Sequence, residues 1–209
     1  MGDCMQKTMK KTVMDTNVGE YRKSEYNINK ILINRWSPRA MTGEKISKNE
    51  LMTLFEAARW APSSYNGQPW RFVYAERETE HWERLFNLLV DFNKMWCSNA
   101  AVLFCLVSRK TFEHNNNPSV THSFDCGSAW ENMALQGSMM GLVVHGMEGF
   151  NYEKARKDLK IPENYHVEMM GAIGKPAGVE SLPDALQKKE LPSGRKNLLE
   201  IIMEGQFKR

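Results

Sequence analysis

The most informative stretch of this chain reads Ala61-Pro62-Ser63-Ser64-Tyr65-Asn66-Gly67-Gln68-Pro69-Trp70. It lies between a predicted helix and a predicted strand, where a short linker would be sufficient. Four of its side chains can donate and accept hydrogen bonds along the edge of a polar heterocycle: those of Ser63, Ser64, Asn66 and Gln68. The two prolines restrict the backbone and make the loop rigid. The stretch therefore predicts either one wall of a binding site or a well-packed turn.

Helices and strands alternate on both sides of this loop. A helix is predicted over 47–60, because Ser47 and Glu50 form a capping box ahead of an apolar stripe. Strands are predicted over 70–75 and over 100–107, where a nearly continuous apolar run is typical of a strand buried on both faces. We also expect helices over 27–34, 79–90, 121–140 and 151–159, strands over 142–145 and 167–173, and a helix or an arm over 197–204. This order indicates an α+β or α/β class with a central sheet.

The bulk properties favour one soluble domain. The 209 residues carry a net charge of +3 from 28 basic and 25 acidic side chains, which is too small and too evenly spread to indicate nucleic-acid binding. No apolar run approaches the roughly 20 residues that span a bilayer, so no membrane association is expected. The polar N-terminus lacks the apolar stretch of a secretory signal, which predicts a cytoplasmic protein. We expect a flexible or partner-wrapping arm over 1–26 and a single domain over 27–209.

Several kinds of chemistry have no motif in this sequence. There is no Gly-x-Gly-x-x-Gly, no phosphate-binding loop of the Gly-x-x-x-x-Gly-Lys-Ser/Thr type and no Gly-x-Ser-x-Gly elbow. The four cysteines form no Cys-x-x-Cys pair and the five histidines show no metal spacing. No metal site is therefore expected, and the cysteines are interpreted as reduced and mostly buried.

A cationic cluster precedes the loop, in the order Arg35-Trp36-Ser37-Pro38-Arg39. Two guanidinium groups and a hydroxyl that converge make a good receptor for a phosphate monoester. The alternative interpretation is a solvated basic helix end.

Two later segments add weaker signals. His145-Gly146-Met147-Glu148-Gly149-Phe150 places glycines around an acidic residue after a predicted strand, where the backbone could approach a flat ring closely. An ordinary strand-to-helix turn would look the same. The turns Ile173-Gly174-Lys175-Pro176 and Ser193-Gly194-Arg195-Lys196 each offer a cation that could complete a phosphate site.

Taken together and in this order, these segments resemble the nitroreductase family of flavoproteins, over roughly residues 27–205. The resemblance implies a nitroreductase-like fold, with a mostly antiparallel central sheet wrapped by helices, and an intertwined homodimer that binds FMN at the subunit interface. The long, weakly charged helix expected over 121–140 fits a buried dimer core.

The resemblance also implies roles for individual residues. Phosphate contacts, with part of the ring edge, would come from Arg35, Ser37, Arg39 and Arg195. The loop residues Pro62, Ser63, Ser64, Asn66 and Gln68 would serve the FMN of the neighbouring subunit. The turn Gly146, Met147, Glu148 and Gly149 would lie beside the reactive face of the flavin, and Lys94 would meet the pyrimidine edge, although its segment can be aligned with a shift. Family members often carry a lysine where this chain has Ser193, so one phosphate cation is missing or replaced by Lys196.

The activity that the resemblance implies is an NAD(P)H oxidoreductase. NADH or NADPH would give a hydride to flavin N5, and a nitroaromatic, quinone or related small acceptor would then be reduced in ping-pong fashion. The flavin carries this chemistry, so no catalytic side chain is predicted. Two alternatives stay open: a different reaction on the same fold, such as dehalogenation or enone reduction, and a non-enzymatic flavin-binding regulatory protein.

Overall fold

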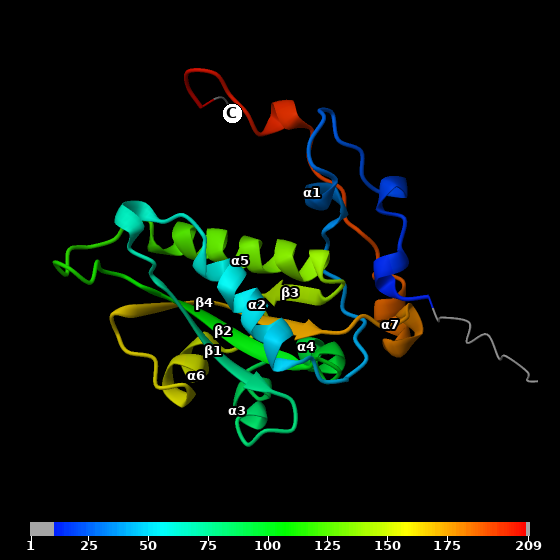
Figure 1. Cartoon of the computed structure of the whole chain (residues 1–209), viewed down its shortest axis with the longest axis horizontal. Coiled ribbons are helices and arrows are strands. Elements are labelled where there is room, and N and C mark those ends of the chain that lie inside the picture. The colour runs from blue at the N-terminus through cyan, green and yellow to red at the C-terminus, as the bar shows by residue number, and fades with distance from the viewer. Residues whose placement is uncertain (1–10, 208–209) are drawn as a thin grey trace, which may run out of the picture.

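A computed structural model describes residues 11–207 of the chain. Its centre is a four-stranded sheet in the order β1-β2-β4-β3, and each neighbouring pair is antiparallel. The strands are β1 (Trp70–Glu76), β2 (Val102–Arg109), β3 (Val143–Met147) and β4 (Tyr165–Gly174). Helices cover both faces of the sheet (Figure 1). The predicted class, α+β with a mostly antiparallel central sheet, is confirmed.

Strand β2 is buried on both faces, as its apolar run predicts. Leu103, Cys105 and Val107 belong to one hydrophobic core. Phe104 and Leu106, which alternate with them, belong to the other core. Because successive side chains of a strand point to opposite faces, this strand joins the two cores of the domain.

Two layers of helices enclose the sheet. One face is covered by α2 (Lys48–Arg59) and α5 (His122–Met139), and the other by α3 (Trp82–Phe86), α4 (Asp91–Cys97) and α6 (Tyr152–Asp158) (Figure 1). The short helices α1 (Lys30–Asn34) and α7 (Asp184–Gln187) lie at one end of the sheet (Figure 1).

The start of α2 follows the predicted capping box. Ser47 Oγ accepts a hydrogen bond from the Glu50 amide at 3.1 Å, and the Glu50 carboxylate accepts one from the Ser47 amide at 2.6 Å. These bonds satisfy two amides that the first turn of a helix leaves without partners.

The prediction of a single helix over 79–90 is wrong. The chain forms α3, turns, and starts α4 at Asp91. Val90 is extended, and its amide donates to the carbonyl of Gly149 at 3.1 Å, while Leu89 forms an isolated bridge with Phe150. The amphipathic pattern continues through this break because the turn buries Leu88 and Leu89 in the same core as α3.

Both ends of the described chain contain little helix. Over 197–204 there is a 3-10 turn at Leu198–Glu200 in place of a longer helix. In the N-terminal arm, Val13 and Val18 are buried, and the Val13 amide donates to the carbonyl of Ala177 at 2.8 Å. Residues 1–10 of that arm lie outside the described residues.

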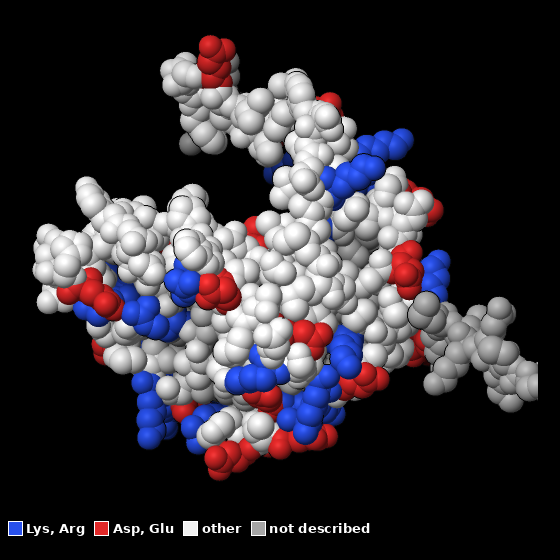
Figure 2. Space-filling model, in the orientation of Figure 1, with Lys and Arg blue, Asp and Glu red and all other residues white. Residues whose placement is uncertain are grey.

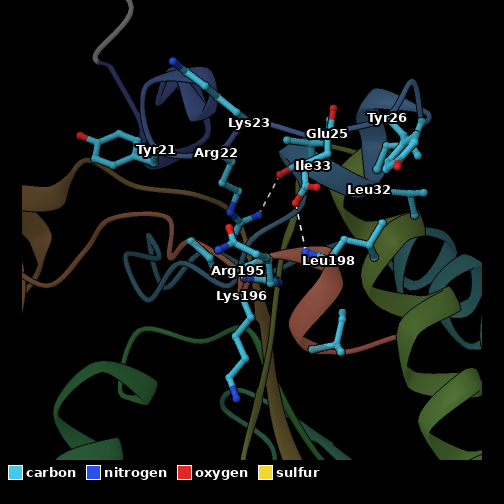
Figure 3. A pocket seen from close by; sticks show the side chains of 15 residues that line it. Tyr21, Arg22, Lys23, Glu25, Tyr26, Leu32, Ile33, Arg195, Lys196 and Leu198 are labelled. Carbon is cyan, nitrogen blue, oxygen red and sulfur yellow. Dashed lines mark hydrogen bonds between the residues drawn. The ribbon is translucent and has the colours of Figure 1, made fainter. Parts of the chain in front are cut away.

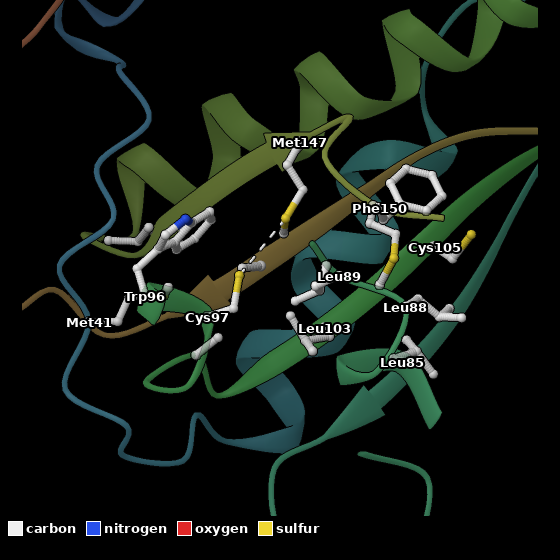
Figure 4. Close-up of a cluster of buried hydrophobic side chains, with 14 of the residues drawn as sticks. Met41, Leu85, Leu88, Leu89, Trp96, Cys97, Leu103, Cys105, Met147 and Phe150 are labelled. Carbon is white, nitrogen blue, oxygen red and sulfur yellow. Dashed lines mark hydrogen bonds between the residues drawn. The ribbon is translucent and has the colours of Figure 1, made fainter. Parts of the chain in front are cut away.

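The core between the sheet and α3, α4 and α6 contains sulfur atoms (Figure 4). Cys97 Sγ lies 3.9 Å from Met147 Sδ, and both Cys97 and Cys105 are free and buried, as is Cys126 in the other core. Burial raises the pKa of Cys105 to about 12, so this thiol stays protonated and unreactive at neutral pH. Cys4 lies outside the described residues.

Charged side chains of both signs are interspersed on the face shown in Figure 2. Among residues 11–207, no helix combines the length and the apolar character that crossing a bilayer requires.

Candidate functional site

A cation-rich cavity of about 360 Å³ lies beside the middle of strand β3, at His145 and Gly146, and beside the segment that follows α1. It brings together five of the predicted site residues, which come from three distant parts of the sequence: Arg35, Ser37, Arg39, Gly146 and Arg195. It is also lined by Arg22, Trp36, His145, Lys189, Leu191 and Ser193. None of these lining residues, all within the described chain, is acidic, so the cavity favours an anion.

The segment 33–40 supplies three of these residues, and past Asn34 it belongs to no helix or strand. Side chains from distant parts of the sequence form hydrogen bonds with its backbone amides and carbonyls. The carboxylate of Glu190, whose side chain is 0% exposed, accepts hydrogen bonds from the amides of Arg39 and Ala40 and pairs with Arg39 Nη1 at 3.3 Å. A buried carboxylate with these donors fixes the backbone at Arg39, because leaving it unpaired would be costly.

His145 holds the middle of the same segment. Its Nδ1 lies 2.9 Å from the carbonyl oxygen of Pro38, and its ring is 4.6 Å from the ring of Trp96. Burial, and then the nearby cations of Arg39 and Arg35, lower the pKa of His145 to about 4 against the hydrogen bond to Pro38. The imidazole is therefore neutral near pH 7. A carbonyl can only accept, so Nδ1 carries the proton and Nε2 is left as an acceptor.

Arg35 combines packing with spare hydrogen-bonding capacity. Its guanidinium lies 5.8 Å from the centre of the Trp130 ring, its Nη1 donates to Ser37 Oγ at 3.3 Å, and its Nε is 3.5 Å from the Glu131 carboxylate. Nε of Arg35 and Nε1 of Trp130 are buried, and neither has a hydrogen-bond partner within the described chain. Buried donors without a hydrogen bond are rare in folded proteins, so Arg35 Nε, which has only the longer ion pair with Glu131, and Trp130 Nε1 keep hydrogen-bonding capacity for a ligand.

The glycine-rich turn packs tightly against its neighbours. A Cβ on Gly149 would lie 2.6 Å from Asn93 Nδ2, and a Cβ on Gly146 would lie 2.7 Å from Met169 Cε. Met147 is buried with its sulfur in the core, whereas Glu148 is exposed. In the single chain, the space beside these two glycines is therefore filled by Asn93 and Met169 of the same chain.

Lys94 lies on α4, outside the cation-rich cavity, and its Nζ is 3.3 Å from the carboxylate of Asp91. Its neighbour Asn93 is buried and donates from Nδ2 to the carbonyl of Gly149 at 2.9 Å. The residue of this segment that touches the glycine-rich turn is therefore Asn93, which the sequence interpretation passed over.

The loop 62–68 does not line the cavity of its own chain. It lies at the opposite end of the sheet from α1 (Figure 1). The Ser64 amide donates to Asp125 Oδ2 at 3.2 Å, Ser63 Oγ accepts from the Gln68 amide at 3.1 Å, and Gln68 Nε2 donates to the Asn66 carbonyl. This placement is compatible with the expectation that the loop serves a second subunit.

Sequence reasoning missed Arg22, Lys189 and Glu190 at the cavity, and Asp125 at the loop. None of them belongs to a local motif, and Arg22, Glu190 and Asp125 are placed by hydrogen bonds to residues far away in the chain. The sequence shows Glu190 directly after Lys188 and Lys189, but no pattern in this segment indicates that the Glu190 side chain is buried.

Comparison with known proteins identifies the family of this chain. A model of the Nitroreductase family matches residues 32–175. The chain belongs to the nitroreductase family. A curated relative in Archaeoglobus fulgidus, named "Putative NADH dehydrogenase/NAD(P)H nitroreductase", is 26% identical over 151 residues, which cover 70% of this chain and 84% of the relative.

Solved structures share the fold of this chain. A crystal structure of an oxidoreductase containing FMN is 41% identical, with a TM-score of 0.85, and the match covers 90% of this chain and 96% of that one. A nitroreductase family protein from Clostridium difficile 630 shares the fold at 21% identity, with a TM-score of 0.66 and coverage of 87% and 100%.

Proposed function

We propose that this member of the nitroreductase family is an FMN-dependent oxidoreductase that takes electrons from NADH or NADPH. The observation that carries the proposal is the cation-rich cavity, where Arg35, Ser37, Arg39 and Arg195 converge beside β3. The names of the two relatives, an oxidoreductase containing FMN and an NAD(P)H nitroreductase, support the same cofactor and electron donor.

The residues present fit a phosphate monoester. The guanidinium groups of Arg35, Arg39 and Arg195 and the hydroxyl of Ser37 would hold the phosphate of FMN. Glu190 compensates only part of this positive charge, and its carboxylate is committed to Arg39 and the Ala40 amide. A dianion bound in the cavity would offset the remaining charge.

The residues beside the phosphate site fit a polar ring. Trp130 Nε1 is a buried donor without a partner, and His145 Nε2 is left as an acceptor. Trp130 also packs beside Gly146, where a Cβ would approach Trp130 Nε1 to 3.0 Å. Both groups could bond a heterocycle held by its phosphate in the cavity. Glu148 and Gly149 would stand beside the reactive face.

Bound FMN would supply the hydride chemistry, accepting two electrons from the nicotinamide and passing them to a nitroaromatic, quinone or related acceptor. The protein's part is to orient the cofactor, shield it from water and stabilise the anionic reduced ring with positive charge near its pyrimidine edge. No side-chain nucleophile is required.

The proposed active unit is a homodimer. Ser63, Ser64 and Asn66 do not reach the cavity of their own chain, and Asn66 is exposed. A second subunit would bring its loop 62–68 to the first subunit's cavity and complete the cofactor site.

The test starts with purified protein incubated with FMN and freed of excess cofactor. We expect a yellow protein whose flavin is bleached anaerobically by NADH or NADPH and recoloured by a quinone or nitroaromatic. A protein that stays colourless would contradict the proposal. Flavin that binds but is never reduced would indicate a regulatory protein, and reoxidation only by a halogenated compound or an enone would indicate another reaction on this fold.

Two variants make the test specific for the cavity. Arg35→Gln should weaken FMN binding by roughly tenfold to hundredfold, because it removes a charge-assisted contact to the phosphate. Arg84→Gln removes the same charge from an exposed site on α3, so its FMN affinity should match that of the parent protein.

A further inference from the structure

Arg22, in the N-terminal arm, makes hydrogen bonds to both segments that supply cations to the cavity. Its Nε donates to the carbonyl of Ser193 at 2.7 Å, and its Nη1 donates to the carbonyls of Ile33 and Arg35, each at 2.8 Å. Figure 3 shows the side chain reaching from the arm toward Ile33, close to Arg195. A single guanidinium therefore joins the backbones of residues 33–35 and residue 193.

The bonded carbonyls lie next to the proposed phosphate contacts. Arg35 is itself one of the proposed contacts, and Ser193 is two residues before Arg195. Ile33 and Arg35 stand at the end of α1, where helix carbonyls lose their intrahelical donors. Without Arg22, these carbonyls would need water as their donor, and within residues 11–207 no other hydrogen bond joins Ser193 to the end of α1.

Arg22 also adds charge to a crowded place. It is partly buried and lines the same cavity as Arg35 and Arg195. Burial, followed by the charges of Arg195 and Arg35, lowers its pKa. Guanidinium groups this close repel one another, and an anion between them relieves the repulsion.

We propose that Arg22 is a positioning residue for the cofactor phosphate, and that docking of the N-terminal arm and binding of the phosphate are coupled. This inference rests on the proposed FMN function. It assigns a role to a residue that precedes the matched family region, residues 32–175. Because coupling between two binding events is reciprocal, phosphate binding must stabilise the docked arm as much as the docked arm improves phosphate binding.

The first experiment separates the phosphate from the ring by titrating FMN and riboflavin, which lacks the phosphate, into Arg22→Gln. We expect FMN affinity to fall by roughly tenfold to hundredfold, since bonds to a charged donor are lost, and riboflavin affinity to stay within twofold. The melting temperature is measured alongside to show that the variant is folded. Equal losses for both ligands, or no loss for FMN, would overturn the proposal.

Two further variants identify the cause. Lys23→Gln removes a positive charge from the adjacent position. Lys23 lines a second cavity, between the N-terminal arm and residues 194–201, but not the cation-rich cavity, so the FMN affinity of this variant should be unchanged. Arg22→Lys keeps the charge but lacks the forked donors, so it should stay at least fivefold weaker than the parent for FMN. Complete recovery in Arg22→Lys would mean that charge alone acts, and would refute positioning.

The second experiment uses trypsin, which cleaves after Arg22 and Lys23. FMN should slow cleavage of the arm in the parent protein severalfold, and riboflavin should slow it much less. In Arg22→Gln, cleavage after Lys23 should no longer respond to FMN. Equal protection by FMN in both proteins would argue against coupling. If the parent protein bound no FMN at all, the proposed function would fail instead, and the two failures are therefore distinguishable.

Discussion

At Tyr65, Asn66 and Gln68, the backbone has positive φ angles of 49°, 52° and 45°. Residues with a side chain rarely adopt this region, and it is costly for bulky ones. Neighbouring contacts hold the loop, including the bond from the Ser64 amide to the buried carboxylate of Asp125. Strain concentrated in a short polar loop supports a binding role for it.

We expect Asn66→Gly to weaken FMN retention without destabilising the fold. Glycine adopts the positive φ freely, and the exposed Asn66 side chain forms no hydrogen bond with residues 11–207. The measurements are the fraction of flavin kept after gel filtration and the melting temperature. Unchanged retention would argue against the loop's role at the proposed partner's site. Lys160→Gly, at another exposed position with positive φ, serves as the control.

His145 makes the stability of the protein depend on pH. Its pKa is lowered to about 4 in the folded chain, whereas an unfolded histidine titrates near 6.5. The unfolded state therefore binds the proton first as the pH falls. The stabilisation is fully present above pH 6.5 and is lost between pH 6.5 and about 4, by up to about 3 kcal/mol.

His145→Gln should remove much of that pH dependence. Urea unfolding at pH 7.5, 6.5, 5.5 and 4.5 gives the free energy of unfolding for the parent and the variant. The curve of the variant should be flatter below pH 6.5, while His81→Gln, at an exposed site, should follow the parent. Parallel curves for His145→Gln and the parent would show that this ring is not the origin of the effect.

Among the elements, helix α5 contains two glycines in opposite settings. A Cβ on Gly137 would lie 2.4 Å from Val144 Cγ2. The helix can therefore approach β3 this closely only because Gly137 has no side chain. Gly127 is exposed, and a Cβ there would meet no atom within 4 Å. The same helix therefore provides a buried test site and its own control.

Gly137→Ala should destabilise the protein by roughly 1–3 kcal/mol, because Val144 and the strand below it must move. Gly127→Ala should stabilise it by up to about 1 kcal/mol, because alanine favours the helix. Chemical denaturation of both variants measures these changes. Destabilisation by Gly127→Ala would mean that this face of α5 is covered, and the proposed partner subunit would then be the surface that covers it.

For the whole molecule, the C-terminal arm exposes apolar side chains that a lone chain would be expected to bury. Leu199 is 80% exposed, Ile201 62% and Phe207 81%. In Figure 1 the arm projects away from the sheet and its helices. Exposed apolar side chains clustered on one segment indicate a protein interface.

The double variant Leu199→Asp/Ile201→Asp should dissociate the proposed dimer. Burial of two such side chains contributes roughly 3 kcal/mol or more, so the dissociation constant should rise at least a hundredfold. Analytical ultracentrifugation would show the parent at twice 24.1 kDa and the variant near 24.1 kDa. Glu204→Gln in the same arm is the control, and a parent protein that sediments as a monomer would contradict the homodimer.

Dissociation should also weaken FMN binding, because the loop 62–68 would no longer contact the cavity of the proposed partner. FMN retention of the monomeric variant should fall together with the dimer fraction. Full retention by a monomer would place all cofactor contacts within one chain.

The amino-acid sequence by itself determined the features that depend on neighbours along the chain. Ser47 and Glu50 cap α2, the prolines and polar residues of 61–70 make a rigid loop, and the apolar run of β2 predicts its burial on both faces. Hydrogen bonds and apolar periodicity act within a few residues, so they can be read locally.

Only the tertiary structure decided what holds the cation-rich cavity together. Arg22, His145 and Glu190 satisfy the backbone of residues 33–40 from 11 to 151 positions away in the chain. The break between α3 and α4 likewise depends on the distant Gly149 carbonyl. Such contacts follow from which backbone groups remain unpaired once the sheet has formed, and no local pattern encodes that.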